Sequence, residues 1–137
     1  MDAVDLNGLV TVIREPICRV AELHQEVRAV YIFGSQSRGV ARPDSDVDLG
    51  VLYRSRQALS ATLQLEREFE QATGRKVDLV DASRAGAFLA LDIVRGERVF
   101  CRDLIDTDLF ELYVLRRAGD LLPFERQRQA LLLATSG

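Results

Sequence analysis

The stretch Tyr31–Tyr53, YIFGSQSRGVARPDSDVDLGVLY, joins two apolar runs through a glycine and a polar loop. The first run, residues 28–33, is rich in β-branched and aromatic residues and ends at Gly34, which predicts a strand. The second run, residues 46–53, alternates polar and apolar residues through Leu49 and predicts another strand. Residues 35–45 are too few for a helical crossover, so we expect these strands to be antiparallel or sharply turned.

The segments on either side alternate between helical and strand patterns. Apolar spacing predicts a helix within residues 9–27, kinked or started late by Pro16. The expected elements that follow are a helix at 56–73, a strand at 76–81, a short helix at 85–96 and a short strand at 97–102, for which a sheet edge is one expected place. A helical segment is expected from about 104 to 135, split by Pro123 and anchored by Leu109, Leu112, Tyr113 and Leu115. This order predicts one α/β (α+β) domain, residues 1–137, with a small mixed sheet flanked by helices.

The bulk properties exclude several classes of protein. The net charge of −3 argues against a general nucleic-acid coat, because no surplus of cations is present to neutralise phosphates. No apolar stretch is long enough to span a bilayer, and the N-terminus lacks the form of a signal peptide, so we expect a cytoplasmic protein. Cys18 and Cys101 are far apart in sequence, and we favour free buried thiols over a disulfide.

The Gly34-Ser35 turn is a candidate anion site. A glycine permits a tight bend after the strand, and the exposed backbone N–H groups of a following helical turn would attract an anion. Ser35 adds a hydroxyl donor, Arg38 offers charge to a phosphate, and Gly39 allows close approach to the backbone. A Gly-Ser pair alone is weak evidence, because most such pairs are ordinary turns.

Asp46 and Asp48 are candidate metal ligands. Residues i and i+2 of a strand project from the same face, so the two like charges repel unless a cation lies between them. Mg²⁺ takes oxygen ligands, often one or two carboxylates together with substrate phosphates. The competing interpretation is a solvated strand face, or a local turn capped by Asp46; Asp44, in the RPDS loop, is not included among the ligands.

Asp78, in the short strand KVDLVD, is the third candidate carboxylate. A carboxylate among Val77, Leu79 and Val80 is costly if buried, unless it is paired or bound to a metal. If this strand adjoins the strand of Asp46 and Asp48, the three can complete a site for two metals. Asp81 is the alternative, three residues further on, and we favour Asp78.

Taken together, these residues resemble a known signature. Gly34-Ser35 followed by Asp46-Val47-Asp48 is similar to the motif of the DNA polymerase β-type nucleotidyltransferase superfamily. The small size, together with KVDLVD, resembles the minimal nucleotidyltransferases, and more narrowly the MntA-type antitoxins paired with HEPN-domain RNase toxins. The resembling region covers residues 31–81.

The resemblance implies a polymerase β-like fold, a reaction and a set of roles. Gly34 and Ser35 would hold a nucleoside triphosphate, with Arg38 and Gly39 beside them. Asp46 and Asp48 would bind two Mg²⁺ ions, and Asp78 would bind one and help to activate an attacking hydroxyl. The reaction would move AMP from ATP to a tyrosine of the cognate HEPN toxin, with release of pyrophosphate.

Two other functions stay open at this point. The chain could neutralise a toxin by binding alone, with a vestigial site. It could also modify a small molecule such as an aminoglycoside, although little chain remains for an acceptor-holding domain unless a homo-oligomer supplies it.

Several residues outside the signature have two interpretations. Arg19 and His24 have the Arg-x4-His spacing of HEPN nucleases, but a solvent-facing histidine is the preferred interpretation. Tyr31 and Tyr53 could stack on a base, although packing is favoured. The remaining features, which fit a solvated helix face or packing turn as well as a protein interface, are Arg116, Arg117, Arg126, Arg128 and the apolar run 130–134.

Overall fold

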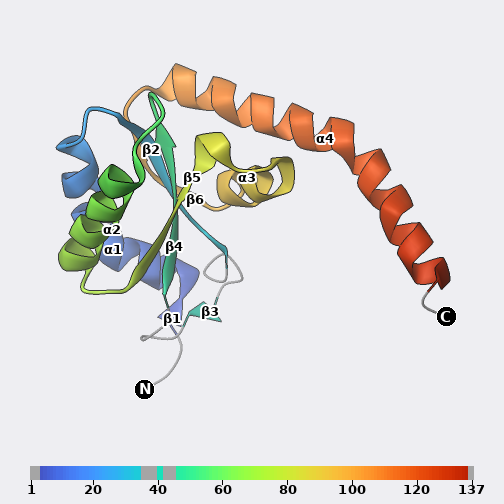
Figure 1. Cartoon of the computed structure of the whole chain (residues 1–137). Helices are drawn as coiled ribbons and strands as arrows, with labels where there is room; N and C mark the ends of the chain where they lie inside the picture. The colour runs from blue at the N-terminus through green and yellow to red at the C-terminus, as the bar shows by residue number, and fades with distance from the viewer. Residues whose placement is uncertain (1–3, 35–39, 42–45, 136–137) are drawn as a thin grey trace.

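The computed structural model describes residues 4–34, 40–41 and 46–135 (Figure 1). In chain order the elements are β1 (Val4–Asp5), α1 (Leu6–Glu22), β2 (Val27–Phe33), β3 (Val40–Ala41), β4 (Val47–Tyr53), α2 (Leu59–Thr73), β5 (Val77–Asp81), a 3₁₀ turn (Ala82–Arg84), α3 (Ala87–Val94), β6 (Glu97–Cys101) and α4 (Leu104–Thr135). The predicted α/β class, with a small mixed sheet flanked by helices, is confirmed.

The main sheet has the strand order β5-β4-β2-β6. β2 is antiparallel to both β4 and β6, whereas β5 is parallel to β4. The antiparallel pairing expected around the Gly34 turn is therefore confirmed, and β6 lies at an edge as expected. β1 and β3, which pair with each other over two residues, were not predicted, because such short strands leave no periodic pattern in the sequence.

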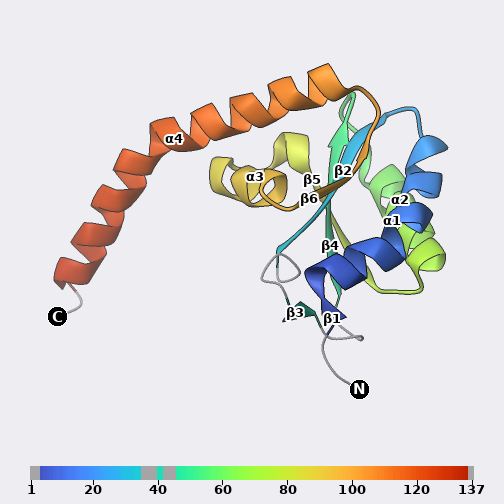
Figure 2. The same ribbon diagram turned by 180° about the vertical axis from the view of Figure 1, so that it is seen from behind.

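Helices cover both faces of this sheet. Figures 1 and 2 show α1 and α2 on one face and α3 on the other. Alternate β4 residues follow this division, since Val47 and Leu49 pack with the α1–α2 core and Leu52 packs with Ile93 of α3. Each face of β4 therefore has its own packing partner.

The first helix differs from its expected form. Pro16 lies inside α1, which begins at Leu6, so the late start is wrong, and the helix ends at Glu22 rather than near residue 27. The Arg102 guanidinium satisfies carbonyls at this end, since it donates to the oxygens of Ala21 (2.9 Å) and His24 (3.0 Å). Arg102, which directly follows β6, thus caps the C-terminal end of α1.

The last helix also differs. α4 is assigned as one helix with Pro123 inside it, so the predicted split is wrong, although Figure 1 shows the helix bending along its length. A proline removes one intrahelical hydrogen bond and kinks a helix without necessarily ending it. The four expected anchors are all exposed, and the buried α4 residues are instead Thr107, Val114 and Ala118. The C-terminal run 130–134 is exposed as well, so it is not a buried packing turn.

Cys18 and Cys101 are free and partly buried. The Cys18 thiol donates to the carbonyl of Val99 at 3.1 Å, and the Cys101 thiol donates to the Thr107 hydroxyl at 3.3 Å. Among the helices in the described part of the chain, none has the length and apolar character needed to cross a membrane.

Candidate functional site

Gly34 ends β2 with φ of +75°, in the left-handed region that favours glycine. A Cβ placed on Gly34 would overlap Oδ2 of Asp48. The Asp48 carboxylate therefore lies directly against the glycine backbone. Gly34 and Asp48, separated by more than ten residues in sequence, are thus in direct contact.

Asp48 and Asp46 stand at the start of β4. Asp48 is half-buried and lies opposite Phe33 in the antiparallel ladder, whereas Asp46 directly precedes the strand and is exposed. Alternation along β4 places Asp48 on the same face as Gly50 and Leu52, which is the face that α3 covers. The pair thus lies at one end of that face.

Asp78 lies level with Asp48 on the neighbouring strand. The parallel ladder of β4 and β5 pairs Asp48 with Asp78, which confirms that the two strands adjoin. Asp78 is exposed although its neighbours Val77 and Leu79 are buried. Asp81, the alternative, accepts hydrogen bonds from the backbone N–H (3.0 Å) and hydroxyl (2.5 Å) of Ser83, and so caps the following 3₁₀ turn.

The position of α3 explains why the carboxylates are not covered. A Cβ on Gly50 would overlap Cγ2 of Ile93, so α3 packs directly on the β4 backbone at that residue. Ile93 is fully buried, whereas Asp46 and Asp48, toward the start of β4, retain exposure. Contact with α3 therefore closes the middle of the sheet face and leaves its carboxylate end accessible.

The donor set suits a hard divalent cation. Asp46, Asp48 and Asp78 supply only carboxylate oxygens, which are ligands that Mg²⁺ prefers. Within residues 4–34, 40–41 and 46–135, no three His, Cys, Asp or Glu side chains are gathered closely enough to form a metal site. Because Mg²⁺ commonly takes only one or two carboxylates beside substrate phosphates, these residues fit that mode of binding.

Ser35, Arg38 and Gly39, the other predicted nucleotide-binding residues, lie outside the described residues. Of the predicted site residues, the structure therefore places Gly34, Asp46, Asp48 and Asp78 at one end of the sheet.

Two glutamates that the sequence analysis did not single out contact the strand of Asp78. Glu70 accepts from the backbone N–H of Val77, and Glu66 accepts from that of Leu79, each at 3.0 Å. Two glutamates one helical turn apart, just before a strand that carries a candidate ligand, are the signal that could have drawn attention to them.

The structure shows the surroundings of three residues that had two interpretations each. Tyr31 and Tyr53 are buried, so packing rather than base stacking is confirmed for both. The Tyr31 hydroxyl donates to Glu111 at 2.6 Å. His24 is half-buried and bonded to Glu68 at 2.9 Å, so the expectation of a solvent-facing histidine is wrong.

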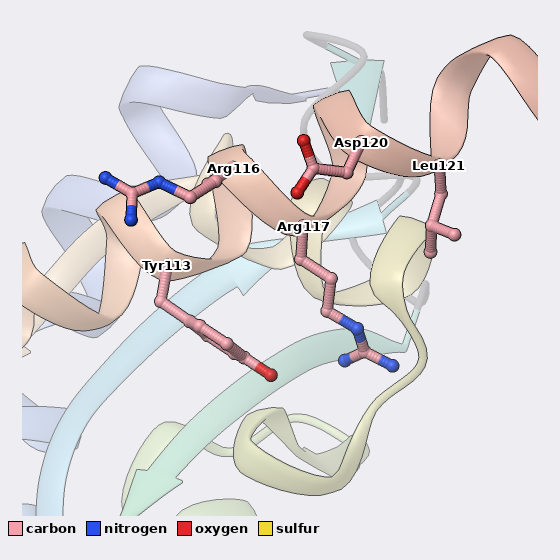
Figure 3. Close-up of a pocket in the computed structure, with 5 residues that line it drawn as sticks. All are labelled: Tyr113, Arg116, Arg117, Asp120 and Leu121. Carbon is pink, nitrogen blue, oxygen red and sulfur yellow. The ribbon is translucent and has the colours of Figure 1, made fainter.

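A pocket of about 340 Å³ lies on α4, far in sequence from Asp46, Asp48 and Asp78. Figure 3 shows the ring of Tyr113 and the guanidinium of Arg117 extending from the same side of the helix. None of the predicted site residues lines this pocket.

The candidate residues at the end of the sheet lie within a region of the chain that matches a known protein family. The family described as "Polymerase beta, Nucleotidyltransferase" matches residues 15–105, well over half of the chain. The chain belongs to this nucleotidyltransferase family. The matched region runs from within α1 to the start of α4.

Two relatives carry the same name. The chain is 25% identical over 133 residues to the protein adenylyltransferase MntA of Shewanella oneidensis, covering 96% of this chain and 88% of the relative. It is 38% identical over 69 residues to the protein adenylyltransferase MntA of Thermococcus cleftensis, covering 50% of this chain and 70% of that relative.

Solved structures share the fold. A toxin–antitoxin structure with AMP-PNP matches with a TM-score of 0.73 at 24% identity, over 90% of this chain and 98% of that one. The complex of a tri-AMPylated Shewanella oneidensis HEPN toxin with an MNT antitoxin matches with a TM-score of 0.70 at 22% identity, over 93% of this chain and 98% of that one.

Proposed function

We propose that this nucleotidyltransferase moves AMP from ATP, with Mg²⁺, to a tyrosine hydroxyl of a cognate HEPN RNase toxin and thereby acts as its antitoxin. The observation that carries the proposal is the placement of Asp48 against the Gly34 backbone and level with Asp78 on the adjacent strand. That arrangement sets carboxylate oxygens beside a turn suited to phosphate.

The acceptor and the nucleotide are inferred from relatives. Two relatives are named protein adenylyltransferases, one similar structure contains AMP-PNP, and another pairs an MNT antitoxin with a tri-AMPylated HEPN toxin. These names support ATP as the substrate and a HEPN toxin as the partner of this chain.

The residues would divide the work as follows. Asp46 and Asp48 would hold two Mg²⁺ ions, and Asp78 would hold one of them. When bound, such ions neutralise phosphate charge and stabilise both the attacking and the leaving oxygen. Gly34 would let the triphosphate approach the backbone, with Ser35, Arg38 and Gly39 completing the turn.

In the chemical step, the tyrosine oxygen forms a bond to the α-phosphorus while the bond to pyrophosphate breaks. Asp78 receives the hydroxyl proton as the oxygen attacks, and pyrophosphate leaves with the electron pair of the broken bond. The half-exposed end of the sheet face gives the large protein acceptor access to this point.

The experiment incubates the full chain with α-labelled ATP, Mg²⁺ and the purified candidate toxin, and measures label on the toxin. We expect Asp46→Asn and Asp48→Asn each to lower transfer on the order of a hundredfold or more, since even residues that only support metal ligands cost about 10- to 100-fold. Folding should be intact or slightly improved in the metal-free variants, because one of two like charges is removed.

Asp81→Asn is the matched control. It lies on the same strand as Asp78 but caps a turn, and asparagine caps as well as aspartate, so transfer should persist. Transfer by the Asp46→Asn, Asp48→Asn double variant would contradict the metal-site proposal. Toxin neutralisation that survives loss of transfer would indicate an antitoxin that acts by binding alone.

A further inference from the structure

β5, the strand that carries Asp78, is an edge strand of the main sheet. Within the described residues its only strand neighbour is β4, on one side. Edge strands leave a row of backbone groups without strand partners, and they separate from the sheet more readily than central strands. The position of Asp78 beside Asp48 therefore depends on what holds the outer edge of β5.

Two α2 carboxylates occupy that outer edge. Glu70 accepts from the Val77 N–H and Glu66 from the Leu79 N–H, both at 3.0 Å. These two amides flank Asp78 directly. All four groups are half-buried or buried, which strengthens such charge-assisted hydrogen bonds.

The spacing of the two elements matches. Amides two residues apart on one side of a strand are about 6.6 Å apart, and residues four apart on a helix are about 6 Å apart along its axis. A helix that runs back along the strand can therefore present i and i+4 carboxylates to i and i+2 amides. The pair does for β5 what the carbonyls of a further strand would do.

We propose that Glu66 and Glu70 are positioning residues for the Asp78 carboxylate. By bonding the amides on both sides of Asp78, they keep β5 in register with β4 and hold Asp78 level with Asp48. The proposal rests on the proposed function, because it takes Asp78 to be a metal ligand.

The first test needs no activity. Amide hydrogen exchange of Val77 and Leu79 is measured in the full chain, in Glu66→Ala/Glu70→Ala and in Glu66→Gln/Glu70→Gln. Exchange at both amides should quicken on the order of tenfold or more in the alanine pair. It should change little in the glutamine pair, whose amide oxygen still accepts. Unchanged exchange in the alanine pair would overturn the proposal.

The second test measures Mn²⁺ binding by the relaxation of solvent water, with and without Asp78→Asn. The alanine pair should weaken Mn²⁺ binding about tenfold when Asp78 is present, as loss of groups that orient a metal ligand does. In the Asp78→Asn background it should cause almost no further loss. An equal loss in both backgrounds would show a merely structural role and overturn the proposal.

Glu68→Ala is the matched control. Glu68 lies between the two glutamates on α2, is similarly half-buried and bonds His24 rather than β5. It should leave both exchange and Mn²⁺ binding unchanged. A wild-type chain that binds Mn²⁺ but transfers no AMP would contradict the proposed function alone, because the exchange and binding results would still decide the role of the glutamates.

Discussion

At the scale of single residues, Gly34 is the position in the candidate site where an added side chain should cost most. Gly34 combines a left-handed backbone with contact to the Asp48 carboxylate, so a side chain there meets two separate penalties. Gly74, which ends α2, has nearly the same φ, +69°, but nothing lies within 4 Å of its Cβ position. The two glycines separate the backbone cost from the cost to the site.

Gly34→Ala should therefore impair the protein more than Gly74→Ala does, because it should lower AMP transfer as well as stability. In both, alanine in the left-handed region lowers the free energy of unfolding by about 1–2 kcal/mol. Gly34→Ala should in addition displace the Asp48 side chain and abolish AMP transfer, whereas Gly74→Ala should retain transfer. Urea unfolding and the labelled-ATP assay measure the two effects. Equal transfer by the two variants would argue against contact between the turn and Asp48.

At the scale of elements, the packing of α3 against β4 sets how much of the sheet face is open. Gly50 has no side chain, and Ile93 occupies the space above it. Because protein interiors are close-packed, an added methyl group at this contact must move either the isoleucine or the helix. The contact between Ile93 and Gly50 is thus one factor that sets how much of the sheet face beside the carboxylates is accessible.

Gly50→Ala should lower the free energy of unfolding by about 1–3 kcal/mol, the usual cost of overpacking a core. Adding Ile93→Leu moves the branch point of that side chain away from the new methyl group. The double variant should therefore lose less free energy of unfolding than the two single variants lose in sum. A coupling of about 1 kcal/mol is expected for residues in contact. Gly119→Ala, in open space on α4, is the control and should not destabilise. Additive effects of Gly50 and Ile93 would contradict the contact.

At the scale of the whole molecule, the first half of α4 packs against the body, where Val114 and Ala118 are buried, and the rest of the helix extends away from it (Figures 1 and 2). The attachment includes a partly buried polar network. Arg98 of β6 contacts Glu111 (2.8 Å) and Asp108 (3.0 Å) of α4, and Glu111 accepts from the Tyr31 hydroxyl of β2. Burial, and then the hydrogen bond to Glu111, raise the pKa of Tyr31 far above its ordinary value.

This pKa shift makes stability fall at high pH. The unfolded tyrosine loses its proton near pH 10 while the folded one keeps it, so the unfolded state gains relative stability as the pH rises above 10. Tyr31 should contribute a loss of about 1 kcal/mol between pH 10 and pH 11. Tyr31→Phe should remove that part of the slope in urea unfolding. Buried Tyr53, whose pKa burial also raises, leaves a remaining slope. The exposed Tyr113→Phe is the control, and the same slope in Tyr31→Phe as in the wild type would contradict the assignment.

Much of the fold can be predicted from local sequence patterns. Alternation in residues 46–53, the aromatic and β-branched run before Gly34 and the glycine at 74 depend on neighbours within one element, and the structure confirms the elements that they predict. Which face of each helix is buried was harder to predict. α4 carries apolar residues on several sides, so its pattern could not indicate that Val114 and Ala118, rather than Leu109 and Leu112, face the body.

For the candidate site, sequence spacing was enough to nominate Gly34, Asp46, Asp48 and Asp78, because residue type and strand alternation are local properties. Only packing between distant segments could decide that Asp48 contacts Gly34 and lies level with Asp78. The same is true of the contact between Ile93 of α3 and Gly50, and of the two α2 glutamates that bond the outer edge of β5. Register and contact across the chain arise from the joint fit of many side chains, and no single stretch of sequence contains that fit.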